Sequence, residues 1–354
     1  MSEQRRIAIL TGGGDCPGLN AVIRAAVKTA RGYGWEVYGI RNGFDGLRRA
    51  DSFRLSRERV RGILHTGGTI LGSTNRIDPF AVQVDDHVED QSDQVIENFQ
   101  NEGFDALVTI GGDGTQAIAY KFWQRGIPVV AVPKTIDNDV SATDVTFGFD
   151  TAVETARDAI DKLHPTAESH QRVRVVEVMG RTVGRIALHA GIAGGADVIL
   201  IPEIPFDIDR VCAAVERRYA GGRRFAIVVV AEGAVPINDK LNLAGLTRDI
   251  MQSPLTNQVA HYIQAKTGHV VRGMVLGHLQ RGGSPTTYDR VLGSRYGAAA
   301  VRLVRDHKYG RMVALRGTEI VSVPLEDAIA QVRAVDPAGD LVQTARDLGI
   351  AFGD

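Results

Sequence analysis

The chain has 354 residues, 44% of them apolar and 6% aromatic, which is enough for one large or two medium α/β domains. The formal net charge of −1 and the two cysteines, Cys16 and Cys212, give no case for a nucleic-acid partner, a disulfide framework or a cysteine-based metal site. The first residues lack a signal-peptide core and the longest apolar run, 225–231, is too short to span a bilayer, so we expect a cytoplasmic protein without membrane contact.

The first predicted strand, residues 6–10, leads into the glycine loop Thr11-Gly-Gly-Gly-Asp-Cys-Pro-Gly-Leu-Asn20 and a helix over 21–30. Glycines before a helix start suit a phosphate group bound at the helix N-terminus. The loop lacks the Gly-Lys-Ser/Thr ending of a Walker loop and the Gly-x-Gly-x-x-Gly of a dinucleotide fold. The loop is therefore predicted to bind a phosphate or nucleotide at the helix N-terminus without either of these motifs.

A second glycine turn, Gly111-Gly-Asp-Gly114, follows the buried strand predicted at 106–110 and precedes a helix expected over 116–121. Consecutive glycines expose backbone N–H groups to phosphate oxygens, and the helix start adds positive partial charge. Asp113 is the one charged residue of the turn, so it is the predicted oxygen ligand of a Mg²⁺ that bridges phosphates. Taken alone, the turn also fits a solvated strand–turn–helix corner.

The strand predicted at 127–132 ends in Pro133-Lys-Thr-Ile-Asp-Asn-Asp139. Ligands bind at the carboxyl ends of the strands in parallel sheets. In an extended segment, the spacing of two predicts that Thr135, Asp137 and Asp139 share one side of the backbone. One carboxylate could then accept a proton from an attacking hydroxyl group. A purely structural acidic loop is the alternative, although it would have little use for Lys134 beside Thr135.

Strand and helix patterns alternate through the rest of the chain, as doubly wound sheets require. The elements expected here are strands at 173–179, 198–201, 225–231, 270–276 and 311–315, and helices near 182–193, 207–219 and 289–305.

The three motifs resemble, in this order, those of the phosphofructokinase family. Further resemblance lies in Ser169-His-Gln-Arg-Val-Arg-Val-Val-Glu-Val-Met-Gly-Arg181, Ala231-Glu-Gly233 and Leu276-Gly-His-Leu-Gln-Arg-Gly-Gly-Ser284. The resemblance implies two doubly wound, Rossmann-like α/β domains with the chain crossing between them. Residues 1–148 with 279–325 would bind ATP and Mg²⁺, and 149–278 with 326–354 would bind fructose 6-phosphate.

The resemblance also implies the reaction, which is the glycolytic phosphorylation of fructose 6-phosphate at its 1-hydroxyl group by MgATP. Asp137 matches the general base, and Thr135 and Asp139 flank it to orient the sugar and the metal. Arg181 matches the arginine that neutralises charge on the transferring phosphoryl group. Arg76 resembles a second such arginine in a stretch one residue longer than the common pattern, and a solvated surface arginine is its alternative.

The binding residues carried over from the family form two sets. The residues expected to bind the donor are Gly14, Arg76, Gly112, Asp113, Gly114 and Thr115. Those expected to bind the sugar phosphate are Thr135, Asp137, Arg172, Met179, Gly180, Arg181, Glu232, Arg272, His278 and Arg281.

Within the second set, an arginine and histidine cluster grips the 6-phosphate and Glu232 binds sugar hydroxyls. Arginine suits this task because its guanidinium group binds phosphate bidentately. In the family Arg172 and Arg272 reach across from a neighbouring subunit, which implies a homotetramer or homodimer with shared sites. A core position beside Leu276 and Leu279 is the alternative for His278, and Cys16 is expected to be a small packing residue.

The phosphoryl donor depends on positions 114 and 134. Pyrophosphate-dependent members carry Asp and Lys there, and common ATP-dependent members carry Gly at both, whereas this chain has Gly114 and Lys134. Without a carboxylate at 114 nothing repels the α-phosphate of a nucleotide, so we expect ATP, with pyrophosphate as the alternative.

Two other functions stay open, an NAD kinase with a similar glycine turn and a silent sugar-phosphate sensor. The phosphate-gripping arginines disfavour the first, and retention of Asp113, Asp137 and Arg181 disfavours the second.

Overall fold

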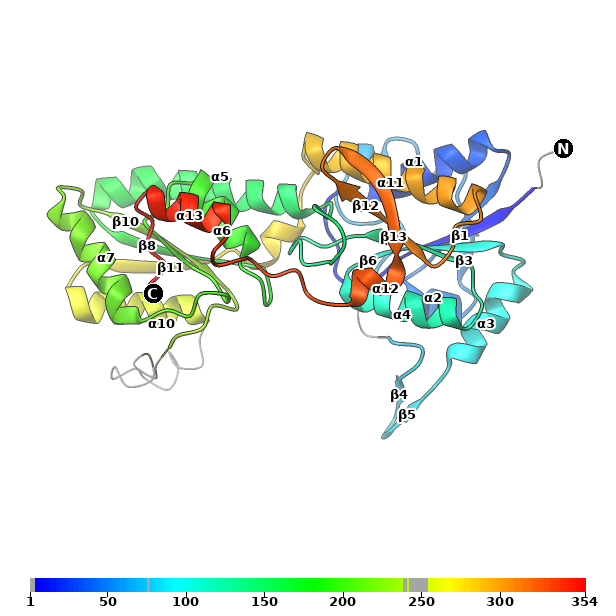
Figure 1. The fold of residues 1–354 in the computed structure, drawn as a ribbon, viewed down its shortest axis with the longest axis horizontal. Coiled ribbons are helices and arrows are strands. Elements are labelled where there is room, and N and C mark those ends of the chain that lie inside the picture. Colours follow the sequence, from blue (N-terminus) through cyan, green and yellow to red (C-terminus); the bar gives the residue numbers. More distant parts are fainter. Residues whose placement is uncertain (1–3, 75–76, 238–240, 242–253) are drawn as a thin grey trace. The chain divides into compact units, whose positions relative to one another are not determined.

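The computed structural model describes residues 4–74, 77–237, 241 and 254–354. The chain forms two compact units, which are Met1–Thr151 with Arg281–Val332 (the first unit) and Ala152–Gln280 with Arg333–Asp354 (the second unit). The chain therefore passes from the first unit to the second, returns, and crosses again (Figure 1). The first two crossings lie two or three residues beyond the boundaries expected at 148 and 279, and the third, after Val332, lies seven residues beyond the one expected at 325. The ligand of each unit remains a prediction.

The first unit contains a seven-stranded sheet in the order β13-β12-β7-β6-β1-β2-β3. Strands β1, β2, β6, β7 and β12 run parallel, and β3 and β13 pair antiparallel at the two edges. The strand bounds are β1 Arg6–Thr11, β2 Glu36–Ile40, β3 Ser52–Arg54, β6 Ala106–Gly111, β7 Val129–Pro133, β12 Arg311–Arg316 and β13 Glu319–Pro324. The strand order reverses at β1, which is the place where open parallel sheets bind ligands.

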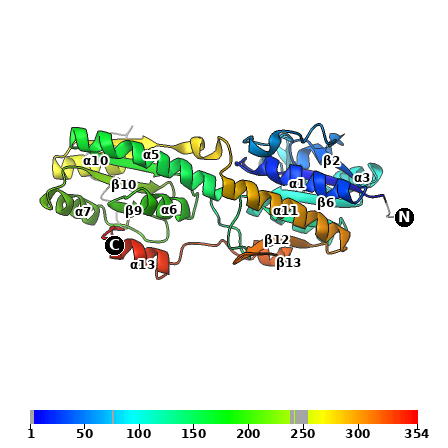
Figure 2. The ribbon, with the colours of Figure 1, turned by 90° about the horizontal axis from the view of Figure 1, so that it is seen from above.

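Helices cover both faces of this sheet. On one face α1 (Leu19–Gly32) lies beside α11 (Thr287–Arg305), as Figure 2 shows. The other face carries α2 (Phe44–Arg48), α3 (Ser92–Asn101), α4 (Asp113–Gln124) and α12 (Leu325–Ile329), whose apolar residues pack with those of the strands into one core. A 3₁₀ turn, Ile63–His65, and a separate hairpin of β4 (Val82–Val84) and β5 (His87–Glu89) complete the unit.

The second unit is built on four parallel strands in the order β11-β8-β10-β9. Their bounds are β8 Val173–Val178, β9 Val198–Leu200, β10 Ala226–Ala231 and β11 Val271–Val275. Both faces of the central strands are buried, because helices lie on each side. These helices are α5 (Phe149–His170) and α6 (Arg185–Ala193) on one face and α7 (Ile208–Ala220) and α10 (Leu255–Thr267) on the other, with α13 (Asp340–Asp347) beside α6 and a 3₁₀ segment, Gly277–Arg281, after β11.

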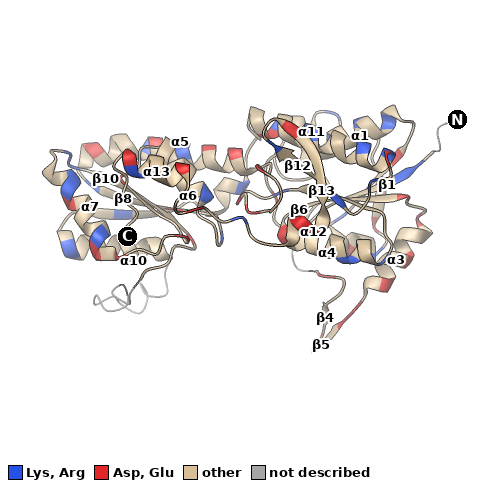
Figure 3. Cartoon of the chain, viewed as in Figure 1, with Lys and Arg blue, Asp and Glu red and all other residues tan. Residues whose placement is uncertain are grey.

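The α/β fold class is confirmed, with one local correction. Helix α4 begins at Asp113, three residues earlier than expected, so Asp113 and Gly114 form its first turn and Gly112 alone is the cap. No helix of the described residues is long and apolar enough to cross a bilayer. Basic and acidic residues are interspersed along the helices of each unit (Figure 3).

Candidate active site

The three predicted motifs meet at the carboxyl ends of β1, β6 and β7 in the first unit. The backbone N–H of Gly12 donates to Ile110 O at 2.9 Å, and that of Lys134 donates to Gly111 O at 2.9 Å. A Cβ on Gly112 would lie 3.3 Å from Lys134 O. The acidic loop therefore lies directly beside the second glycine turn.

The glycines of this region serve different purposes. A Cβ on Gly12 would lie 2.6 Å from Thr115 Oγ1, and one on Gly111 would lie 2.3 Å from Thr115 Cβ, so the buried Thr115 side chain requires both glycines. A Cβ on Gly114, in contrast, would meet no atom of the described residues within 4 Å. Gly114 thus leaves open space next to the exposed Asp113 at the N-terminus of α4.

The acidic loop is a bend, which corrects the expectation of an extended segment. Asn138 has a φ of +53°, and the Asp137 N–H donates to Thr135 Oγ1 at 3.1 Å. Thr146 closes the bend, because its N–H donates to Asn138 Oδ1 at 2.9 Å and its hydroxyl donates to Thr135 O at 2.8 Å. Asp137 and Asp139 are 9% and 6% exposed. No local sequence pattern indicated Thr146, which lies beyond the motif.

Lys134 connects the acidic loop to the first glycine loop. Its side chain is 4% exposed, and Nζ donates a hydrogen bond to Gly14 O. Burial lowers the pKa of Lys134, and the positive charge of Arg281 adds to this effect. Cys16, which has no Lys neighbour in the sequence, has Lys134 near it in space, yet burial raises the pKa of the thiol, so Cys16 stays protonated.

Arg281 also lies on the first glycine loop. A Cβ on Gly14 would lie 1.7 Å from Arg281 Nη1, so the guanidinium group occupies the place that a side chain at position 14 would need. Its Nε is buried and has no hydrogen-bond partner among the described residues. Arg281 belongs to the first unit, whereas Arg172, Arg272 and His278 belong to the second. Its part in the 6-phosphate cluster remains a prediction.

In the second unit, Met179, Gly180 and Arg181 follow β8, and Glu232 follows β10 at the same end of the sheet. Glu232 Oε1 accepts the N–H groups of Gly180 at 3.2 Å and Arg181 at 2.6 Å. Arg181 has a φ of +54° and is exposed, and a Cβ on Gly233 would lie 2.1 Å from Arg181 O. Glu232 and Gly233 therefore shape the turn that presents Arg181.

His278 is exposed in the described structure, which does not fit the alternative of a core histidine. Arg172 and Arg272 lie at the opposite end of the sheet, where β8 and β11 begin. The six residues of β8 separate them from Arg181 and Glu232 by about 20 Å. One sugar phosphate cannot touch both groups within a single protomer. Arg76 lies outside the described residues.

A buried carboxylate, not indicated by the sequence, ties together the segments behind the loops. Asp289 is 0% exposed and accepts hydrogen bonds from Gly148 N at 2.9 Å, Thr151 N at 2.9 Å and Thr151 Oγ1 at 2.6 Å. Burial raises the pKa of Asp289 to about 6, against the opposing effect of these hydrogen bonds. Thr286 donates in turn to Asp150 Oδ2 at 2.6 Å, so the starts of α5 and α11 cap each other.

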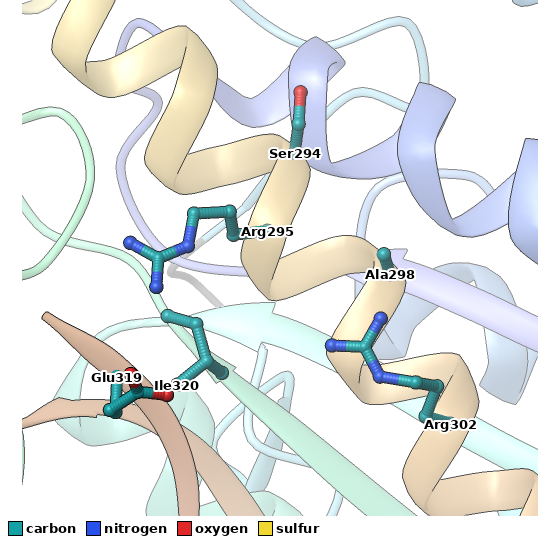
Figure 4. A pocket seen from close by; sticks show the side chains of 6 residues that line it. All are labelled: Ser294, Arg295, Ala298, Arg302, Glu319 and Ile320. Carbon is teal, nitrogen blue, oxygen red and sulfur yellow. The ribbon is translucent and has the colours of Figure 1, made fainter.

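A separate groove of about 420 Å³ lies between α11 and β13 in the first unit (Figure 4). Its lining includes Arg295 and Arg302 of α11 and Glu319 of β13. None of the predicted site residues that the structure describes lines it, and we assign it no function.

Comparisons with known proteins agree with the motifs. A protein of Chloroflexus aurantiacus named ATP-dependent 6-phosphofructokinase is 53% identical over 359 residues, covering 100% of this chain and 99% of its own. A Streptomyces coelicolor protein named pyrophosphate–fructose 6-phosphate 1-phosphotransferase is 48% identical over 354 residues, covering 98% of this chain and all of its own.

The crystal structure of Pichia pastoris phosphofructokinase in the T-state aligns with a TM-score of 0.81 at 34% identity, over 93% of this chain. The alignment covers 36% of the yeast chain, so this chain spans about a third of that one. The family model described as Phosphofructokinase matches residues 6–304. On the motifs, the fold and these matches together, the chain belongs to the phosphofructokinase family.

Proposed function

We propose that the protein transfers the γ-phosphoryl group of ATP to the 1-hydroxyl group of fructose 6-phosphate, as an ATP-dependent 6-phosphofructokinase of glycolysis acting in the cytoplasm. The observation that carries the proposal is the convergence of the glycine turn and the acidic loop at β1, β6 and β7. Full-length relatives with this activity in their names support it. We assign donor binding to the first unit and sugar binding to the second.

Asp137 is the proposed general base. It accepts the proton of the 1-hydroxyl group while the hydroxyl oxygen bonds to the γ-phosphorus and the bond from phosphorus to the departing ADP oxygen breaks. Thr135 accepts the Asp137 N–H and so holds the backbone of the base in its bend. Arg181, with Arg76 as the second cation, neutralises charge on the moving phosphoryl group. Positioning and charge neutralisation provide most of the catalysis in phosphoryl transfer.

The residues present fit a magnesium ion that the substrate brings. The described residues hold no cluster of three or more His, Cys, Asp or Glu side chains that could bind a metal alone. Mg²⁺ commonly binds through one or two carboxylates, waters and substrate phosphates, so one exposed carboxylate beside a phosphate-binding turn suffices. Asp113 occupies that position at the start of α4. When bound there, Mg²⁺ supplies positive charge to the donor phosphates.

Gly114 favours ATP over pyrophosphate. Since a side chain at 114 would meet no described atom within 4 Å, the fold does not require glycine there. What glycine provides is uncharged space beside Asp113, which a nucleotide α-phosphate can use. The buried Lys134 and the Streptomyces relative keep pyrophosphate as the second candidate donor.

The sugar phosphate is proposed to bind residues of two protomers. Arg181, Glu232 and His278 lie at one end of the second-unit sheet and Arg172 and Arg272 at the other, too far apart for one ligand. A homotetramer or homodimer would supply the missing arginines from a neighbouring copy. Each substrate site then needs two chains.

The test is an assay of the purified protein with fructose 6-phosphate and either ATP or pyrophosphate, coupled to detection of fructose 1,6-bisphosphate. We expect turnover with MgATP and none above background with fructose as the acceptor. Turnover with pyrophosphate alone would reverse the donor assignment. Binding of fructose 6-phosphate without turnover would identify a silent sensor, and phosphorylation of NAD by ATP would identify an NAD kinase.

A further inference from the structure

Three arginines lie together on one face of the second-unit sheet. Arg174 of β8 is the register partner of Arg272 on β11, in strands that run parallel. Arg172 stands two residues before Arg174 and therefore projects to the same face. Neighbouring strands lie about 4.8 Å apart, so the three guanidinium groups share one small region. The motifs of the sequence indicated Arg172 and Arg272 but gave no role to Arg174.

Protein contacts leave this cluster largely uncompensated. Arg174 Nη2 donates to Thr166 Oγ1 of α5 at 3.2 Å, while its buried Nε has no hydrogen-bond partner among the described residues. Arg272 Nη1 donates to the backbone O of Val271 at 2.9 Å. No carboxylate within the described part of the chain forms an ion pair with any of the three arginines. Glu177, also on β8, projects to the other face and accepts Thr256 N.

The cluster therefore costs free energy in the unliganded protein. Burial lowers the pKa of Arg174, and the positive charges of Arg172 and Arg272 lower it further. Like charges opposite each other on paired strands are destabilising. An anion that binds all three guanidinium groups would remove this repulsion and occupy the unused donors.

The cluster also lies where a second copy of the chain could reach it. Strand β11 stands at one edge of its sheet, and β8 is its single partner among the strands of the described residues. Exposed apolar side chains line the strand and its continuation, with Val275 44% and Leu279 71% exposed. Soluble proteins seldom leave an apolar sheet edge uncovered, so a second copy is the expected cover.

We propose that Arg174 is a third phosphate-binding side chain, which acts with Arg172 and Arg272 on the 6-phosphate of the sugar bound by a second copy of the chain. The inference rests on the proposed function. It assigns a residue that the family resemblance left without a role. Bidentate guanidinium contacts to a phosphate dianion are among the stronger hydrogen bonds in proteins.

The experiment compares Arg174→Ser and Arg174→Lys with the wild-type protein. Arg217→Ser is the matched control, because Arg217 is an exposed arginine on α7, which packs on the opposite face of the same sheet. KM and kcat are measured with fructose 6-phosphate, Kd is measured by calorimetry without a donor, and subunit assembly is followed by sedimentation.

Arg174→Ser should raise KM and Kd for fructose 6-phosphate about tenfold or more, because the loss of a hydrogen bond to a charged group weakens binding by at least that factor. The value of kcat should stay within about twofold of the wild type. Arg174→Lys should restore part of the affinity, and Arg217→Ser should change neither constant. An unchanged Kd in Arg174→Ser would overturn the inference. So would a raised Kd that returns to normal once high protein concentration restores assembly, because Arg174 would then pair with a neighbour's carboxylate.

The calorimetric arm separates this inference from the proposed function. Wild-type protein that binds fructose 6-phosphate but transfers no phosphoryl group would contradict the function alone, and the Arg174 variants would still be tested by Kd. Wild-type protein that binds no fructose 6-phosphate would contradict both.

Discussion

The Asp137 carboxylate depends on neighbours outside its own motif. Asn138 adopts a left-handed φ of +53°, and its side chain and the Thr135 carbonyl both bond to Thr146. These contacts fix a bend in which Asp137 is 9% exposed, beside the glycine turn. The proposed base is thus held by hydrogen bonds at the carboxyl end of β7, which fixes its position without burying the carboxylate completely.

Replacing Asp137 by Ser should lower kcat at least about a hundredfold, because a positioned general base contributes about 10² to 10⁴ in rate. The coupled assay with MgATP and fructose 6-phosphate measures the loss. Asp86→Ser, an exposed acidic residue of the turn between β4 and β5, is the control and should keep wild-type turnover. Near-normal turnover of Asp137→Ser would exclude the role of base.

Position 114 tests the choice of donor. Gly114→Asp should fold with unchanged stability, since its Cβ would meet no described atom within 4 Å. The new carboxylate should lower kcat/KM for ATP at least about a hundredfold, because like charges in close contact cost several kcal/mol. The measurement is kcat/KM for ATP and for pyrophosphate, together with Tm as the folding control. Unchanged kcat/KM for ATP would show that the donor does not use this space.

At the scale of elements, Asp289 connects the starts of helices α5 and α11 by hydrogen bonds. It caps the start of α5 through Gly148 and Thr151, close to the point where the chain leaves the first unit. Asp289 itself lies in the first turn of α11, a few residues after the chain has re-entered the first unit at Arg281. One buried carboxylate therefore connects two segments of the first unit, the start of α5 and the start of α11.

Because the Asp289 carboxyl group is buried, we expect the free energy of unfolding to depend on pH. The pKa of Asp289 is about 6 in the folded protein, against 3.8 as its ordinary value. Between these values the folded state binds more protons than the unfolded state, so the free energy of unfolding falls as pH rises from 4 to 6. The contribution is about 3 kcal/mol, at 1.36 kcal/mol per pKa unit.

Urea unfolding of the wild-type protein and Asp289→Asn at pH 4, 5, 6 and 7 measures this effect. The asparagine does not titrate, so the difference in free energy of unfolding between the two proteins should change by about 2 kcal/mol from pH 4 to pH 7, with most of the change complete by pH 6. A constant difference at all four pH values would show that Asp289 does not titrate in this range.

The elements that could be predicted were those whose signal lies in a short contiguous stretch of sequence. Strands β1 and β6 are short buried runs that lead into glycines, and β7 is a buried run that leads into the acidic motif, so the pattern alone identified all three. The start of α4 was misjudged because glycine is a poor helix former, yet Gly114 lies in its first turn. Helix α5 was not predicted, and it contains Pro165.

The site was predictable to the same extent. The glycine turns and the acidic loop are contiguous motifs, so their meeting at the carboxyl ends of neighbouring strands followed from parallel topology. The bend at Asn138 was missed because its cause, Thr146, lies eight residues away. The contact of Asp289 with Gly148 spans 141 residues and leaves no periodic signal in either segment.

At the scale of the whole molecule, the second-unit residues proposed to bind the sugar phosphate are divided between the two ends of one sheet. The proposed site therefore requires at least two chains, and its parts can be supplied separately. In the proposed site, Asp137 would serve its own protomer and Arg272 would serve the site of the neighbouring copy.

Mixed oligomers test this division. Asp137→Ser and Arg272→Ser should each be nearly inactive alone at moderate substrate concentration. After denaturation and refolding together in equal amounts, about a quarter of wild-type activity should appear, because half of randomly paired dimers are mixed and one of their two sites is intact. The activity of the mixture is compared with that of the two proteins refolded separately and then combined. No gain on refolding together would place Arg272 in the site of its own chain.

The empty space at Gly114 has a consequence for the evolution of donor choice. A single base change converts some glycine codons into aspartate codons, and a Cβ at this position would meet no described atom within 4 Å. A lineage could thus change its phosphoryl donor from ATP to pyrophosphate by one substitution at position 114, without a loss of folding stability. Selection on the cell's supply of nucleotide or pyrophosphate, rather than on the architecture of the enzyme, would then decide which version survives.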